Sequence, residues 1–135
     1  MSEDCLLKLQ GSLEITCSVA AEWFMSASIV KSRENYFSRG GLGDKGTGAV
    51  YMYIKEKDVI YIGETGRTIK SRQHDERSPH KDKIWWEEWS EVRFLQIPNR
   101  TDRIILESLL ILHMKPRVNT KPSYRAIEDM FKDLN

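Results

Sequence analysis

The sequence predicts one small domain of the mixed α/β (α+β) class, because strand-like and helix-like patterns follow one another along 135 residues. Apolar and aromatic residues alternate over residues 49–63, which is the two-residue period of strands. A second run of β-forming residues covers 91–97 and ends before Pro98. Residues 104–114 are apolar nearly all round a helix, which is typical of a buried helix.

Composition excludes several classes of protein. Hydrophobic residues make up 40% and charged residues 30% of the chain, which is a globular balance rather than a disordered one. No apolar run reaches the roughly 18 residues of a membrane span. Cys5 and Cys17 are too few for a disulfide framework or a four-cysteine zinc site. The acidic N-terminus does not resemble a secretory signal, so we expect a cytoplasmic (intracellular) protein with reduced thiols.

The first third of the chain is predicted to be mainly helical. Residues 19–30 are mostly apolar and predict a packed helix, whereas Gly11 and the pair Ile15–Thr16 leave a strand open at that point. Residues 38–48 hold five glycines in eleven positions. Because the spacing of a P-loop is missing there, a flexible connector is the expected structure.

Residues 49–63 predict a β-hairpin. Pairing Tyr51 with Tyr61 leaves a loop at about 55–57 and separates two sets of side chains onto opposite faces. A slip of one residue would mix the two sets, so the pattern favours this register. One face then carries Val50, Met52, Ile54, Ile60 and Ile62, and the other carries Tyr51, Tyr53, Val59 and Tyr61.

Helix caps and prolines delimit the remaining elements. Thr68 is suited to cap a short helix, and Thr101 or Asp102 to cap a longer one. The pair Lys115–Pro116 ends the longer helix, since proline disfavours helix in the residue before it. The predicted elements are a helix at 68–77, a strand at 91–97, a helix that ends near 114 and a helix at 123–134.

Glu107 is a carboxylate at the centre of an apolar helical stripe. Glutamate is almost never fully buried without a partner, because burial of an uncompensated charge is costly. Three kinds of compensation remain open: a proton, a cation from the protein such as Arg103 one turn back, or a metal such as Mg²⁺ held by one carboxylate and waters. Its helical neighbours are Ile104, Leu110, Ile111 and Met114.

The tyrosine strands and the buried acid occur in an order that resembles the GIY-YIG nucleases. The second tripeptide of the family is intact at 61–63 (YIG), and the first is represented by AVY at 49–51. Glu107 is followed twelve residues later by Asn119, with a KPR run between them. The resemblance covers about residues 48–122.

The resemblance implies a three-stranded antiparallel sheet flanked by helices. Residues 1–47 would then be an N-terminal helical extension with a Gly-rich connector, and residues 48–135 the nuclease core with a C-terminal helix. The implied activity is divalent-metal-dependent endonuclease hydrolysis of DNA, with one Mg²⁺ or Mn²⁺ ion per site. Because cutting both strands with one site per chain favours a pair of chains, a homodimer is a further expectation.

The resemblance also assigns roles to individual residues. Glu107 would hold the metal, and Arg72 would bind the scissile phosphate, which a guanidinium contacts in bidentate fashion. Tyr51 would help to activate water or act as the base, provided that an electropositive pocket lowers its pKa. Tyr61 would hydrogen-bond in the site, and Asn119 would order the helix end and the hydrogen bonds of the site.

The sequence departs from the family pattern around the second motif. Glu64 stands where a lysine is common, so that positive contact is absent or comes from other bases. Ser71 occupies the usual place of the arginine, so Arg72 lies one residue later and Arg67 is a lesser candidate. The predicted substrate-binding residues are Arg67, Lys70, His74, Lys115 and Arg117.

Three alternatives stay open. Tyr53 competes with Tyr51 for the first motif, although spacing and face favour Tyr51. A non-catalytic nucleic-acid-binding module could keep the same scaffold. The cluster of Trp85, Trp86 and Trp89, together with the N-terminal helices, could instead bind a partner protein.

Overall fold

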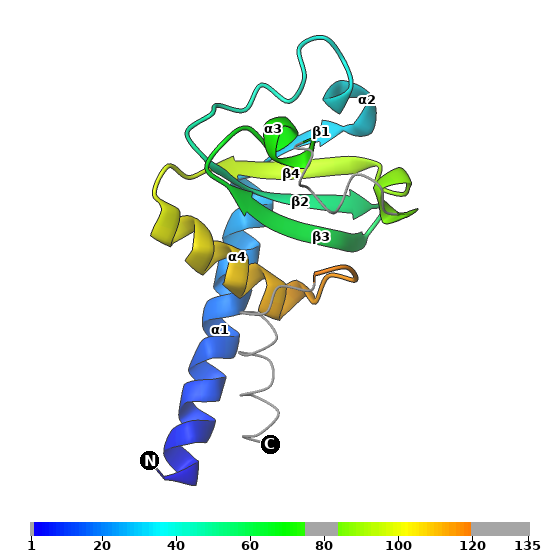
Figure 1. The fold of residues 1–135 in the computed structure, drawn as a ribbon. Coiled ribbons are helices and arrows are strands. Elements are labelled where there is room, and N and C mark those ends of the chain that lie inside the picture. Colours follow the sequence, from blue (N-terminus) through cyan, green and yellow to red (C-terminus); the bar gives the residue numbers. More distant parts are fainter. Residues whose placement is uncertain (1, 75–83, 120–135) are drawn as a thin grey trace.

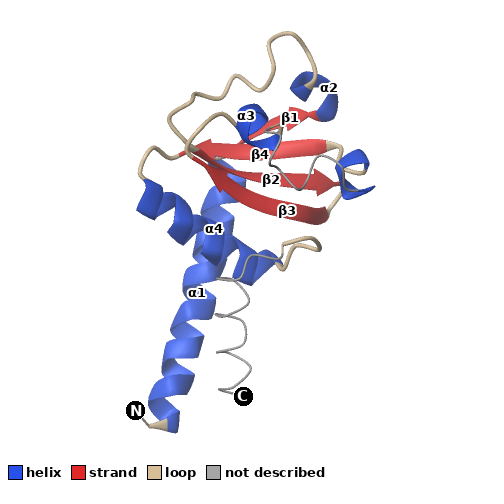
Figure 2. Ribbon diagram, in the orientation of Figure 1, coloured by secondary structure: helices blue, strands red, loops and turns tan. Residues whose placement is uncertain are grey.

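The computed structural model describes residues 2–74 and 84–119. Its sheet has four antiparallel strands in the order β1-β4-β2-β3, with α1 and α4 on one face and α2 and α3 on the other (Figures 1 and 2). This confirms the predicted class, an antiparallel sheet flanked by helices, although the sheet has one strand more than expected. The elements are α1 (Glu3–Ala27), β1 (Ile29–Ser32), α2 (Arg33–Tyr36), β2 (Ala49–Lys55), β3 (Asp58–Thr65), α3 (Ile69–Gln73), the 3₁₀ turn η1 (Ile84–Glu87), β4 (Glu91–Gln96) and α4 (Arg100–Met114).

The additional strand, β1, comes from the segment that was predicted to be helical. Helix α1 begins after Ser2, whose side chain accepts a hydrogen bond from the Cys5 amide, and it includes residues 11–16, where a strand had stayed open. It ends at Ala27, and Ile29 then pairs with Phe94 of β4. The β-branched residues at 29–30 favour this extended conformation. Within the described ranges, no helix is both long and apolar enough to cross a membrane.

The hairpin forms in a register different from the predicted one. Tyr61 lies opposite Tyr53 rather than Tyr51, and the register shifts between Tyr53 and Ile54. The shift leaves Ile60 as an extra residue in β3, so Ile60 packs on the tyrosine side and Val59 on the other side. Pairing is displaced by two residues, which explains why the tyrosines still share a face.

The hairpin turn is shorter than the predicted loop. Lys55 pairs with Asp58, so the turn contains only residues 56 and 57. Glu56 has a φ of 57°, which is the positive value that a two-residue hairpin turn needs. No glycine or asparagine signals this turn in the sequence, and the pairing of the strands therefore decides it.

The sheet separates two cores. The first is aromatic and joins the sheet to α2, α3 and the tryptophan turn η1. The second is aliphatic and joins the sheet to α1 and α4. The aromatic core contains Tyr36, Leu42, Tyr51, Tyr53, Ile60, Tyr61, Ile69, Trp85, Trp86, Trp89, Val92 and Phe94, among others. The aliphatic core contains Ala21, Phe24, Val50, Met52, Ile54, Ile62, Leu106, Leu110 and Ile111.

The helix boundaries differ in detail from the predictions. Thr68 caps α3 as predicted, with its side chain accepting from the Ser71 amide. Asn99, rather than Thr101 or Asp102, caps α4. Helix α3 ends at Gln73, and the predicted continuation at 75–77, like the predicted helix at 123–134, lies outside the described residues.

The segment after α4 runs along the outer edge of β3. The Arg117 amide donates to the Val59 carbonyl at 3.3 Å, and the Val118 amide donates to the Ile60 carbonyl at 3.0 Å. The Asn119 side chain continues this ladder, because its Oδ1 accepts from the Ile62 amide at 2.9 Å and its Nδ2 donates to the Ile62 carbonyl at 2.6 Å. Asn119 therefore binds the backbone of the second motif.

Replacing Asn119 with alanine is expected to destabilise the fold. The variant leaves the buried Ile62 amide and carbonyl without their side-chain partner, which costs about 2–3 kcal/mol of unfolding free energy. Urea unfolding of wild type and Asn119→Ala measures the difference. A change below about 0.5 kcal/mol, the range of ordinary surface substitutions, would contradict this role.

Candidate active site

Two buried tyrosines, Tyr51 and Tyr61, lie at the centre of the candidate site. The rings of Tyr51 and Tyr61 lie 6.3 Å apart between centroids, and the side chains are only 1% and 4% exposed. Tyr51 lies opposite Gly63, and a Cβ atom at Gly63 would stand 2.6 Å from the Tyr51 hydroxyl oxygen. Glycine at this position is therefore required for the two phenols to approach the backbone of β3.

Glu107 and Arg72 both act electrostatically on these two phenols, although their helices, α4 and α3, lie on opposite faces of the sheet (Figure 1). Burial raises the pKa of Tyr61 to about 12, with the Glu107 carboxylate raising it further and the Arg72 guanidinium lowering it. Burial also raises the pKa of Tyr51 well above 10. Arg72 lowers this pKa and Glu107 raises it, as they do for Tyr61. The structure thus brings these four predicted residues into one electrostatic neighbourhood.

The raised pKa of Tyr51 bears on its expected role as a base. An electropositive pocket was expected to lower the pKa of this phenol so that it could act as a base. In the structure, loss of hydration dominates, and the attraction of Arg72 is too weak to offset it. In the protein by itself, Tyr51 and Tyr61 therefore stay protonated at neutral pH, and their hydroxyls keep a hydrogen to donate.

Arg103 has a partner other than Glu107. Its Nε donates to Glu64 Oε2 at 2.9 Å, and its Nη1 donates to the carbonyls of Ile97 at 3.1 Å and Pro98 at 2.8 Å. The Arg103 side chain is 7% exposed, so Glu64 provides charge compensation for a buried guanidinium. The ion pair accounts for the acid at position 64. The three contacts also fix Arg103 between β3 and the segment that precedes α4.

Glu107 is suited to hold a hard divalent cation. Its side chain is 5% exposed and lies near two phenol oxygens, and carboxylate and other oxygen donors are what Mg²⁺ and Mn²⁺ prefer. In the ranges that the structure describes, no group of three or more His, Cys, Asp or Glu residues is arranged to hold a metal. An ion here would therefore be held by a single protein carboxylate, as Mg²⁺ often is, with water or phosphate oxygens completing its coordination.

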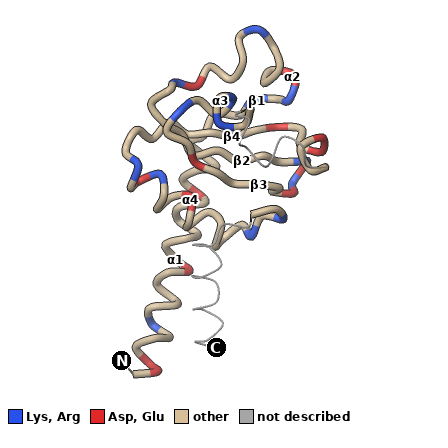
Figure 3. Tube along the Cα trace, viewed as in Figure 1, with Lys and Arg blue, Asp and Glu red and all other residues tan. Residues whose placement is uncertain are grey.

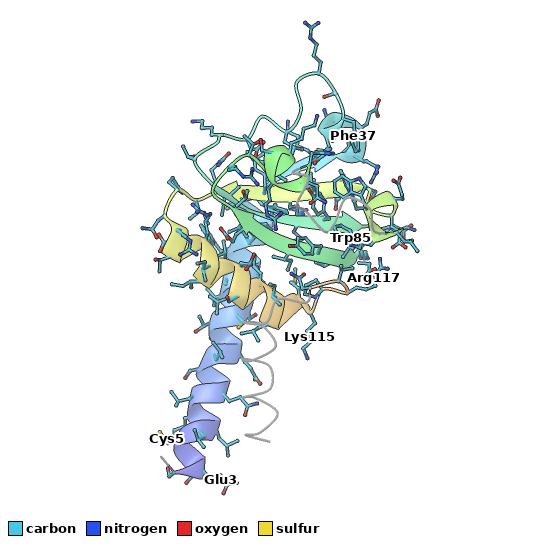
Figure 4. The ribbon with its side chains drawn as sticks, in the orientation of Figure 1. Glu3, Cys5, Phe37, Trp85, Lys115 and Arg117 are labelled. Atoms are coloured by element: carbon cyan, nitrogen blue, oxygen red, sulfur yellow. The ribbon has the colours of Figure 1, made fainter. Side chains whose placement is uncertain are left out.

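The predicted substrate-binding bases fall into two groups. Lys70 lies on α3, with Arg67 just before this helix and His74 just after it. Figure 3 shows the blue of lysine and arginine at α3. Lys115 and Arg117 lie on the loop after α4, on the other side of the sheet from α3 (Figure 4). The Arg117 guanidinium contacts Glu88 at 2.6 Å and Asp58 at 3.4 Å, so it serves first to tie this loop to the hairpin turn and η1.

Sequence reasoning missed two residues that lie outside the motifs. The Tyr36 hydroxyl lies 3.0 Å from His74 Nε2, and Asp44 Oδ2 accepts from the Ile69 amide at 2.7 Å. The Gly-rich segment therefore differs from the expected flexible connector, since Asp44 and the buried Leu42 fix it to the core. The sequence does contain a sign of this order. Leu42 is an apolar residue and Asp44 a helix-capping residue, and both lie within the glycine run.

One apolar groove of the structure lies away from these residues. It runs between α1 and α4, and its lining carries no candidate catalytic group. The groove therefore does not belong to the site around Glu107. Its lining residues are Ala20, Trp23, Ile97, Asp102, Ile105, Leu106 and Leu109.

Comparison with known proteins gives one similar solved structure. No protein-family model matches the chain, and no curated protein does. The structure is similar to the GIY-YIG N-terminal endonuclease domain of UvrC from Thermotoga maritima, a point mutant bound to its catalytic divalent cation. The match has a TM-score of 0.47 and 24% sequence identity, and it covers 57% of this chain and 87% of that domain. That domain belongs to the family whose motifs the sequence resembles.

The buried phenols predict a loss of stability in alkali. A tyrosine has a pKa near 10 in the unfolded chain, whereas the pKa of Tyr61 is about 12 in the folded chain. The unfolded state therefore loses its protons first, so the stabilisation is fully present below about pH 10 and is lost as pH rises toward about 12. Urea unfolding at about pH 8, 10 and 11 measures this trend, and phenolate absorbance checks its cause. Ionisation of every tyrosine with a midpoint near 10 would contradict it.

Proposed function

We propose that the chain is a divalent-metal-dependent endonuclease that hydrolyses phosphodiester bonds of DNA. The observation that carries the proposal is a pair of buried phenols, 6.3 Å apart between ring centroids, on which a buried carboxylate and a guanidinium both act electrostatically. Separately, each of these groups has an ordinary structural explanation. Together they supply the donors that phosphodiester hydrolysis needs, namely a metal ligand, a phosphate clamp and groups that orient water.

Glu107 and Arg72 supply the charge stabilisation in this proposal. Glu107 holds one Mg²⁺ or Mn²⁺ ion, whose chemistry is to stabilise negative charge on the phosphate and leaving oxygens. Arg72 is half-buried on α3 and binds the scissile phosphate through two parallel hydrogen bonds. A lysine could not replace it in this role, because an ammonium cannot make the planar bidentate contact.

Tyr51 and Tyr61 orient the attacking water and do not take its proton. Their pKa values lie above the neutral range, so both hydroxyls keep a hydrogen to donate and a lone pair to accept. In this proposal the Tyr51 hydroxyl binds the attacking water. Tyr61, beside it, provides a further hydrogen bond in the site. Asn119 acts behind them as a positioning residue, because its amide is occupied by the Ile62 backbone.

The bases around α3 extend the site along the DNA backbone. Arg67 is exposed, and Lys70 and His74 lie on the same short helix and its end, so together they suit the phosphates next to the scissile one. Lys115 and Arg117 lie beyond the β3 edge and suit phosphates farther away. A homodimer would place two such sites on the two strands, and an intracellular location would give access to DNA.

A second candidate function is a nucleic-acid-binding module without activity. The low exposure of Tyr51, at 1%, favours it, since a catalytic group must touch its substrate or water. A plasmid-nicking assay with Mg²⁺, with Mn²⁺ and with a chelator separates the two candidates. Nicking that needs the metal supports the enzyme, whereas salt-dependent binding without nicking supports the module.

Replacing Glu107 with glutamine is expected to abolish nicking. The amide keeps the size of the side chain but removes the charge that holds the cation, so activity should fall by about 100-fold or more. The nicking rate and the melting temperature measure activity and folding separately. The matched control is Glu22→Gln, the same change on the exposed surface of α1. Full activity of Glu107→Gln would reject the metal role.

The two neighbouring tyrosines of β2 provide a second test. Tyr51→Phe is expected to lose most activity, about 10- to 100-fold, because it removes the hydroxyl that orients water. Tyr53→Phe is expected to keep activity, since Tyr53 is buried in the aromatic core and its hydroxyl has no hydrogen-bond partner among the described residues. The comparison uses nicking rates at equal metal concentration. The reverse result would assign the first motif to Tyr53.

A further inference from the structure

The helix that carries the phosphate-binding residues is too short to hold its own position. Helix α3 spans only Ile69–Gln73, whereas isolated helices need roughly 12–15 residues to be even marginally stable. Of its residues, Ile69 and Gln73 are buried. Arg72 can meet a phosphate reproducibly only if contacts from other elements fix both ends of this helix.

Asp44 fixes the N-terminal end. Its Oδ2 accepts a hydrogen bond of 2.7 Å from the Ile69 amide, which is one of the donors that a helix start leaves unpaired. Its neighbour Leu42 is 4% exposed in the aromatic core and holds the loop against the sheet. The Gly43 backbone has a φ of 73°, so a glycine between them allows both contacts at once.

Tyr36 fixes the C-terminal end. Its hydroxyl lies 3.0 Å from Nε2 of His74, the residue that caps α3. The Lys70 ammonium donates to the Tyr36 carbonyl at 3.2 Å and lies 5.6 Å from the centre of its ring. One fully buried tyrosine thus contacts both sides of the turn that carries Arg72.

Tyr36 is itself held rigidly. Its ring packs edge-on against Trp86 and Trp89, with centroids 5.7 and 5.2 Å away. Arg33, at the start of α2, donates to the carbonyls of Trp86 at 2.7 Å and Trp89 at 3.2 Å and lies over the Trp89 ring at 4.5 Å. The segment that presents Tyr36 is therefore also anchored outside α3, to the tryptophan turn η1 and to Trp89.

We propose that residues 33–48, which lie outside the two motifs, form a positioning segment that sets α3 for phosphate binding through Asp44 at one end and Tyr36 at the other. The inference rests on the proposed function, because it treats Lys70, Arg72 and His74 as phosphate-binding residues. Tyr36 and Asp44 are positioning residues and do not touch substrate. The Tyr36 hydroxyl and His74 Nε2 share a hydrogen bond, and the tautomer of the His74 ring decides which of the two atoms donates.

The first test compares Tyr36→Phe with Tyr53→Phe. Both variants remove one hydroxyl from a fully buried tyrosine of the same core, but only Tyr36 bonds His74. Nitrogen-15 NMR of the His74 ring reports its tautomer, and fluorescence anisotropy with a labelled DNA duplex in the absence of divalent metal reports binding. Nicking assays give kcat and KM, and the melting temperature reports folding.

Tyr36→Phe is expected to shift the His74 ring-nitrogen resonances, weaken duplex binding and lower kcat/KM about tenfold or more, with a melting temperature close to wild type. Tyr53→Phe should leave duplex binding and kcat/KM unchanged and should shift the His74 resonances much less than Tyr36→Phe does, because the Tyr53 hydroxyl acts on Tyr36 and only through it on His74. Wild-type resonances and binding in Tyr36→Phe would overturn the proposal. If the wild type does not nick DNA at all, the proposed function fails, whereas the resonances and the binding still decide the positioning role.

Asp44→Ala tests the other end of the helix. Hydrogen exchange of the Ile69 amide should quicken at least tenfold, because that amide loses its acceptor, and duplex binding should weaken. Glu34→Gln is the matched control, an exposed acid of the same segment. Unchanged exchange at Ile69 in Asp44→Ala would overturn the role of this residue.

Discussion

The burial of the Glu107 carboxylate is the constraint on which the site depends. A carboxylate that is 5% exposed loses most of its hydration, and the cost is several kcal/mol unless another charge compensates it. The cation one turn away, Arg103, is bonded to Glu64 and two carbonyls. The Glu107 carboxylate acts electrostatically on the phenols of Tyr51 and Tyr61, and the Arg72 guanidinium acts on the same phenols in the opposite sense. A divalent cation bound here would be attracted to Glu107 more strongly than to an exposed carboxylate, because the charges of a buried pair are less screened by water.

The geometry of the sheet determines which groups meet Glu107. Gly63 lets the Tyr51 ring lie against the β3 backbone, and the bulge at Ile60 keeps Tyr61 on the same face. Asn119 binds the backbone of Ile62 between these two positions. The phenols are thus placed by backbone contacts, and their pKa values follow from the burial that this placement causes. In the proposed function, these neutral hydroxyls orient the attacking water.

The sequence was sufficient to predict the class of fold, the strands at 49–63 and 91–97, and the helix that carries Glu107. These elements have strong periodicity, so local patterns decide them. The register was wrong because the bulge at Ile60 and the positive φ of Glu56 follow from strand pairing and leave no local sign. Strand β1 and the contacts of Tyr36 and Asp44 were missed because they join residues that are far apart in the chain. Burial, which the sequence does not report, raises the pKa of Tyr51, so its expected role as a base stays a prediction.

Metal binding by itself tests the central claim most directly. Titration calorimetry with Mn²⁺ on the wild type and on Glu107→Gln measures the ion and its ligand without any need for DNA or turnover. The account predicts one ion bound per chain in the wild type and a loss of that binding in the variant, with the fold intact by circular dichroism. Equal binding to both proteins, or no binding to the wild type, would contradict it.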